Sequence, residues 1–156
     1  MQRSTPTTLA PVLSLLLLVP TVARAQHRGP PEEVGAVRSV LVEMWAALER
    51  GDLDAYAEHV HPDFTSFGES DVYRAEGKEL ELESTGDWLD RGARVHTEML
   101  QPRITVRGDV AWITYYWRDW GSVGVERYAS RGKSTRIFVK EDGRWLCVHG
   151  HYTAVP

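Results

Sequence analysis

The chain has 156 residues, of which 42% are hydrophobic and 26% charged, with a formal net charge of −4 at pH 7. This size fits one domain with one core. An acidic chain without a basic stripe argues against nucleic acid as a partner. Cys147 is the single cysteine, which excludes an intrachain disulfide. A lone thiol in an oxidising compartment is usually buried.

The first 25 residues have the pattern of a secretory signal peptide, with a basic start at Arg3 and an apolar run over residues 12–19. Ala23-Arg24-Ala25 matches a small-x-small cleavage site. We therefore expect cleavage after Ala25 and a secreted or periplasmic protein. The apolar run is far shorter than the roughly 20 residues that span a bilayer. We expect no permanent membrane anchor.

Residues 26–32 are predicted to form a polar linker, and residues 33–156 the folded domain. The domain begins with a helix, because apolar residues recur at three- and four-residue steps from Val34 to Leu48. Gly51 is placed to cap this helix at its C-terminus.

A second, short helix is predicted to begin at Asp52 as N-cap and to end near His61, since Pro62 disfavours helix in the residue before it. The segment 63–68 is predicted as a short strand or an extended loop. A third, weaker helix is predicted over Lys78–Leu89.

From residue 95 the hydrophobic period changes to two, which predicts strands. Residues 95–121 are predicted as two strands joined at Arg107-Gly108-Asp109, and residues 133–153 as a hairpin turning at 141–143. Residues 122–130 connect them. Helices followed by an antiparallel meander give an α+β pattern, in which a curved sheet wraps over the helices.

Both faces of strand 110–120 are apolar and aromatic. Alternation places Trp112, Thr114, Tyr116 and Arg118 on one face, and Ile113, Tyr115 and Trp117 on the other. One face covers the helices, and the other would be an exposed apolar patch unless a partner covered it. We expect a homodimer formed through the outer face of the sheet.

The last strand, read with strict alternation, carries Trp145, Cys147, His149 and His151 on one face. Paired histidines at this spacing occur in some zinc sites. His59 and His61, however, stand at a predicted helix end, where residues two apart diverge by about 200°. We therefore expect no metal and no cofactor. The better interpretation is that the paired histidines hydrogen-bond pocket residues or orient a ligand.

Three segments, residues 51–68, 96–118 and 134–156, resemble the SnoaL-like branch of the nuclear-transport-factor-2-like superfamily. The association domains of calcium/calmodulin-dependent kinase II are closest in pattern. The most specific run of the resemblance comprises Thr135, Arg136, Asp142, Gly143, Trp145, His149 and His151.

The resemblance implies a cone-shaped half-barrel, a curved antiparallel sheet wrapped around N-terminal helices, with a pocket at its wide end. Members commonly dimerise through the outer sheet face. The resemblance also implies arginines that point into the pocket, at positions matched here by Arg118 and Arg136. The resemblance also implies a third pocket arginine, whose position falls near Glu81 in this chain when the sequences are matched without gaps.

An inward-facing arginine is costly unless it is paired. Arg136 could therefore form a structural salt bridge, or could share with Arg118 the recognition of a ligand carboxylate. The acids considered for a salt bridge are Glu43, Asp63, Glu76 and Glu81. The aromatic residues Trp45, Tyr56, Trp112 and Tyr116 fit either the core or the walls of a small-molecule cavity.

A carboxylate general base is the remaining candidate for chemistry. Asp63 with His61, beside His149, could act in this way, although His-Pro-Asp-Phe also suits a plain turn after a helix. The sequence contains no Ser-centred nucleophile elbow, phosphate loop or nucleotide fingerprint.

The leading hypothesis is a domain that binds a small, acidic and partly apolar molecule in its conical pocket. Arg118 and Arg136 would anchor the acid group, His149, His151 and Tyr116 would orient it, and Trp45, Tyr56 and Trp112 would form the walls. One alternative is a cofactor-free isomerase, dehydratase or hydrolase that uses Asp63, His61 or His149. Another is an oligomerisation scaffold with a vestigial pocket.

Overall fold

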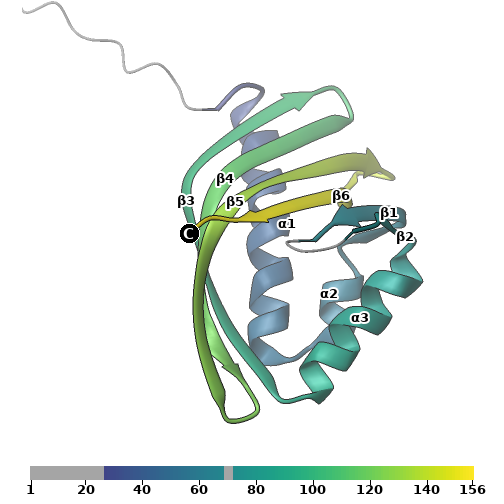
Figure 1. Cartoon of the computed structure of the whole chain (residues 1–156). Coiled ribbons are helices and arrows are strands. Elements are labelled where there is room, and N and C mark those ends of the chain that lie inside the picture. Colours follow the sequence, from purple (N-terminus) through teal and green to yellow (C-terminus); the bar gives the residue numbers. More distant parts are fainter. Residues whose placement is uncertain (1–26, 69–71) are drawn as a thin grey trace, which may run out of the picture.

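A long N-terminal helix lies against the inner face of one strongly curved sheet, and two shorter helices lie beside it (Figure 1). This computed structural model describes residues 27–68 and 72–156, so the predicted signal peptide lies outside the described residues. The helices are α1 (Pro31–Arg50), α2 (Leu53–Ala57) and α3 (Lys78–Asp90). The strands are β1 (Val60–Phe67), β2 (Ala75–Glu76), β3 (Ala93–Arg107), β4 (Val110–Val123), β5 (Glu126–Glu141) and β6 (Arg144–Ala154). The predicted α+β class is confirmed.

The six strands form a single sheet in the order β2-β1-β6-β5-β4-β3. Neighbouring strands are antiparallel except β1 and β6, which run parallel. The expectation of an antiparallel sheet is therefore wrong at this pair. No tight turn links β1 to β6, because α3 and the strands β3 to β5 lie between them in the chain. A parallel pairing of these two strands is therefore possible. Among the described residues, no helix is long and apolar enough to cross a membrane.

The predicted stripe of α1 supplies the core on the helical side. Val37, Leu41 and Met44 are fully buried, and they belong to one cluster with Ile113 and Phe138 of the sheet. The N-terminal end of α1 is held by Glu33. Its carboxylate accepts hydrogen bonds from Lys140 Nζ at 2.6 Å and from Trp145 Nε1 at 2.7 Å, and the hydrogen bond from Lys140 is the main cause of the lowered pKa of Glu33. These contacts fix the helix against β5 and β6.

The second helix is shorter than predicted. Asp52 caps it as expected, accepting a hydrogen bond from the amide of Ala55 at 3.0 Å, but it ends at Ala57. The chain is already extended at Val60, which lies opposite Cys147 of β6. Pro62 excludes helix before it, and the backbone of this segment is satisfied by the neighbouring strand instead. The premise that His59 and His61 stand at a helix end is therefore wrong for His61, which lies in β1.

Strands β4 and β5 form one continuous long hairpin. Residues 122–130, predicted as a connection, are its tip, and the chain turns at Gly124 with φ +59°. The turns predicted at residues 107–109 and 141–143 are confirmed.

Candidate functional site

The register of β4 against β5 divides the predicted site residues between two faces of the sheet. Arg136 lies opposite Ile113, on the inner face that packs against α1, whereas Tyr116 and Arg118 lie opposite Lys133 and Arg131. Trp112, Tyr116 and Arg118 are exposed on the outer face. The prediction that Arg118 and Arg136 point into one pocket is wrong, and Arg118 instead lies 3.8 Å from the carboxylate of Glu98.

Trp117 lies on the opposite face from its even-numbered neighbours, as the alternation predicts. That face is the inner one, because Ile113, Tyr115 and Trp117 are all buried. Strand alternation correctly grouped the residues of β4. It could not tell which group would meet the helices.

A β-bulge in β6 moves the two histidines to the outer face. Phe138 lies opposite Cys147 and Ile137 lies opposite His149, so Val148 is the extra residue. Cys147 therefore points inward, while His149 and His151 point outward. His149 Nδ1 lies 2.8 Å from Thr65 Oγ1, and the ring of Phe67 lies 5.9 Å from His149 and 5.5 Å from His151. The prediction that the histidines share a face with Trp145 and Cys147 is wrong.

Arg136 is the centre of a polar cluster on the inner face. Its side chain is buried, with Cζ 4.5 Å from the centre of the Tyr152 ring and Nη1 3.8 Å from Cys147 Sγ. Its Nε has no hydrogen-bond partner. Within residues 27–68 and 72–156, no ion pair includes Arg136. None of the four acids considered for a structural salt bridge therefore forms an ion pair with Arg136 in the described part of the chain.

Trp45 and Tyr56, for which the sequence left core and cavity wall open, are both buried and belong to the hydrophobic core. Trp45 packs edge-on against Tyr115 with 5.5 Å between ring centres. The Tyr56 hydroxyl donates a hydrogen bond to Glu81 Oε1 at 2.6 Å. The carboxylate of Glu81 is therefore engaged by a tyrosine, and no ion pair joins it to Arg136 in the described part of the chain.

The side chains that contact Arg136 are neutral at neutral pH. The carboxylate of Glu81 acts on this cluster, since after burial it contributes to the raised pKa values of Tyr56, Tyr152 and Cys147, but in the described part of the chain it forms no ion pair with Arg136. Burial raises the pKa of Cys147, and burial also raises the pKa values of Tyr56, Tyr115 and Tyr152. Burial opposes the charge on Arg136 itself, but the surrounding ionisable groups, Tyr152 first, raise its pKa well above the usual value. A permanently charged guanidinium thus sits among neutral hydroxyls and a neutral thiol.

The candidate catalytic residues are not assembled into one site. His61 accepts a hydrogen bond on Nδ1 from the backbone amide of Asp63 at 3.0 Å, and its Nε2 lies 3.2 Å from Glu141 Oε1. Asp63 itself is exposed. His149 is held by Thr65, and burial, with the neighbouring His151, lowers its pKa. In the described part of the chain, neither His61 nor His149 forms an ion pair with Asp63.

The described ranges, 27–68 and 72–156, contain no group of three or more His, Cys, Asp or Glu side chains that could hold a metal ion. His59 pairs instead with Glu43 at 3.6 Å, and His96 pairs with Glu49 at 3.1 Å. Burial is the main cause of a lowered pKa at His59.

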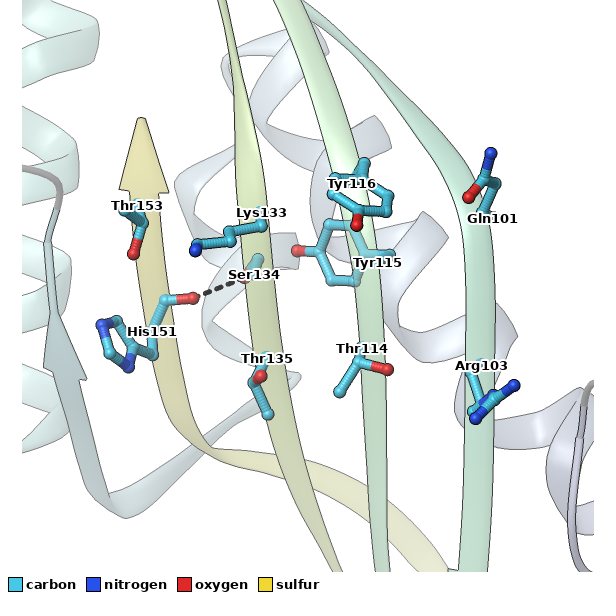
Figure 2. Close-up of a pocket in the computed structure, with 10 residues that line it drawn as sticks. All are labelled: Gln101, Arg103, Thr114, Tyr115, Tyr116, Lys133, Ser134, Thr135, His151 and Thr153. Carbon is cyan, nitrogen blue, oxygen red and sulfur yellow. Dashed lines mark hydrogen bonds between the residues drawn. The ribbon is translucent and has the colours of Figure 1, made fainter. Parts of the chain in front are cut away.

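Two predicted ligand residues, Tyr116 of β4 and His151 of β6, line the same hollow on the outer face (Figure 2). The hollow has a volume of about 530 Å³ and spans β3 to β6. Its lining residues are Gln101, Arg103, Thr114, Tyr115, Tyr116, Lys133, Ser134, Thr135, His151 and Thr153. The sequence interpretation missed Arg103 and Lys133 here, and Tyr115 and Tyr152 on the inner face. The β4–β5 register would have found Lys133, because it lies directly opposite Tyr116.

Known structures share this architecture. A proposed dehydratase of the NTF2-like family from Streptomyces avermitilis superposes with a TM-score of 0.75 at 16% identity, covering 82% of this chain and 99% of that chain. The kinase II hub homology domain of Chlamydomonas reinhardtii gives a TM-score of 0.66 at 22% identity, covering 80% of this chain and 99% of that domain. These identities establish a common fold and no more.

Sequence comparison points to the same group. The chain is 32% identical over 69 residues to a calcium/calmodulin-dependent protein kinase type II of Caenorhabditis briggsae, which is 43% of this chain and 13% of the kinase. The matched segment is thus a small part of that relative. The profile of the SnoaL-like domain matches residues 37–156. Because this match covers most of the chain, the protein belongs to the SnoaL-like domain family.

Proposed function

We propose that this domain binds a small carboxylic acid with an apolar body inside its cone, and that Arg136 anchors the acid group. The observation that carries the proposal is the unpaired charge of Arg136, which is 4% exposed and has an Nε without a hydrogen-bond partner. A buried charge without a counter-ion costs several kcal/mol. A ligand carboxylate would supply the missing charge and accept hydrogen bonds from the planar guanidinium.

The neighbours of Arg136 favour an acid with an apolar body. Tyr115 interacts with Arg136 and packs in turn against Trp45, and Tyr152 contributes a ring and a hydroxyl. Such a mixture of apolar walls and a few polar groups is typical of small-molecule sites. Catalysis is not part of the proposal, since His61 is held by the Asp63 backbone amide and Glu141, whereas His149 is held by Thr65.

The ligand proposal predicts stabilisation by acids and not by their neutral counterparts. At a free concentration one hundred times its dissociation constant, a matching acid should stabilise the fold by about 2.7 kcal/mol. Thermal unfolding should be followed with a panel of aromatic and aliphatic carboxylic acids, each paired with its primary amide as the uncharged control. Equal stabilisation by acid and amide would contradict an anchor based on charge.

The outer face supports a second role, self-association, which we propose takes the form of a homodimer through this face. Large apolar side chains are exposed there, among them Trp112 at 38%, Tyr116 at 53% and Trp120 at 40%. Exposed large aromatic side chains on one face of a sheet are candidates for an interaction site. The fold is shared with hub and association domains of calcium/calmodulin-dependent kinase II, and this similarity supports a role in self-association.

The double variant Trp112→Arg, Tyr116→Arg should be monomeric, because it removes apolar contact area and adds like charges to a symmetric interface. Sedimentation velocity should give twice the monomer mass for the unsubstituted protein and the monomer mass for the variant. Val42→Arg provides the control, since Val42 is 44% exposed on α1, away from the outer face. A dimer that survives the double substitution would place the interface elsewhere.

We also propose that the protein acts outside the cytoplasm, as the pattern of residues 1–25 predicts. Complete burial of the single thiol, Cys147, supports this location, because a buried thiol is protected from oxidation and exchange.

A further inference from the structure

The outer face of the sheet is strongly basic although the chain as a whole is acidic. The register of β3, β4 and β5 gathers exposed cationic side chains on this face. They are Arg94, Arg103, Arg107, Arg118, Arg127, Arg131 and Lys133. The acids of these strands on the same face are Glu98, which pairs with Arg118, and Glu141, which pairs with His61. Because the cations come from three strands, they form no basic run in the sequence. The expectation of a chain without a basic stripe is wrong, since the fold brings these cations onto one face.

The hollow described above lies within this basic face and is lined by two of its cations. Arg103 of β3 and Lys133 of β5 line it from two sides, and no carboxylate is among its lining residues. Figure 2 shows Lys133 extending from β5 toward β6, where His151 and Thr153 lie. Within the described part of the chain, neither Arg103 nor Lys133 forms an ion pair.

Neutral hydrogen-bonding groups complete the lining. The hydroxyls of Thr114, Tyr116 and Thr135 stand between the two cations. Two cations with several hydroxyl donors match a dianionic oxyanion better than a single carboxylate, because a phosphate monoester carries up to two negative charges and three acceptor oxygens. The volume of about 530 Å³ is within the range of small-molecule sites and exceeds what a bare phosphate needs. The half-exposed ring of Tyr116 offers a flat surface to the rest of such a ligand.

We propose that this hollow is a binding site for a small phosphate monoester, with the charges of Arg103 and Lys133 attracting the phosphate from the two sides of the hollow and the Tyr116 ring contacting the esterified group. The site is on the opposite side of the sheet from Arg136 and does not depend on the acid site proposed there. If two copies pair through the outer face, which rests on the proposed dimer, a bound dianion would also offset the repulsion between their cationic faces.

The test is a titration of the full chain with phenyl phosphate at low ionic strength, measured by isothermal titration calorimetry. We expect saturable binding that weakens about tenfold or more in Lys133→Gln and in Arg103→Gln, as loss of a charge-assisted contact predicts. Arg127→Gln is the matched control, since Arg127 is exposed on the same strand and face as Lys133 but outside the hollow, and it should leave the affinity unchanged. Arg136→Met should also leave it unchanged, which separates this site from the inner one.

Two results would overturn the proposal. One is the absence of saturable binding by the unsubstituted chain. The other is an equal loss of affinity in Arg127→Gln and Lys133→Gln, which would indicate only the general attraction of a basic face.

Discussion

Replacing Arg136 with methionine is expected to raise the free energy of unfolding of the ligand-free protein by about 1–4 kcal/mol. Methionine fills the space of the arginine stem without a charge, whereas the guanidinium is buried with no ion pair and with its Nε unsatisfied. The contacts with Tyr152 and Cys147 recover part of the cost of burial, and this sets the lower end of the range. Urea unfolding of protein freed of bound small molecules measures the difference.

The sign of this change separates a binding residue from a structural one. If Arg136 were paired in a way that stabilised the fold, its removal would cost several kcal/mol. Arg118→Met is the matched control, because Arg118 is mostly exposed, and its stability should change by no more than about 0.5 kcal/mol. A marked loss of stability in Arg136→Met would contradict the idea that this charge is kept for a ligand.

Gly132→Ala is expected to destabilise the domain by about 3 kcal/mol, at the upper end of the range for overpacking. Gly132 lies opposite Trp117 on the inner face, and a Cβ there would be 2.2 Å from the carbonyl oxygen of Thr153 and 2.3 Å from the Trp117 ring. The backbone of β6 and a buried indole would both have to move. Urea unfolding, with the far-ultraviolet circular dichroism as the signal, measures this loss.

Gly35→Ala is the control for the glycine prediction. Gly35 lies inside α1, and a Cβ there would meet nothing within 4 Å. Alanine should therefore stabilise the protein by about 0.5–1 kcal/mol through its higher helix propensity. Equal stability of Gly132→Ala and the unsubstituted chain would show that the close packing of Trp117 over β5 is not needed for the fold.

Those parts of the fold that depend on local patterns could be predicted from the sequence. The apolar stripe of α1, the Asp52 cap and the turns around Gly108 and Gly143 are all determined by neighbouring residues, and the structure confirms them. The parallel pairing of β1 with β6 could not be predicted in this way, because it joins segments from the two ends of the domain.

The candidate site was predicted only in part, because its residues are placed by register. Alternation assigns residues of one strand to two groups but does not relate the groups of different strands. Tyr116 and Arg136 were therefore expected on one face, although Tyr116 pairs with Lys133 and Arg136 pairs with Ile113. A single extra residue, Val148, likewise places His149 and His151 of β6 on the face opposite to the one that strict alternation predicts.

Recognition of a ligand acid group by the buried charge of Arg136 is the central proposal for this domain. Its most direct test is calorimetric titration of the unsubstituted protein and Arg136→Met with whichever carboxylic acid stabilises the fold most. We expect methionine to lower the affinity by about 10- to 100-fold or more, which is the free energy of a hydrogen bond to a charged group converted to a ratio of dissociation constants. A dissociation constant that changes by less than about twofold, which corresponds to less than about 0.4 kcal/mol, would contradict a role of Arg136 in binding the acid group.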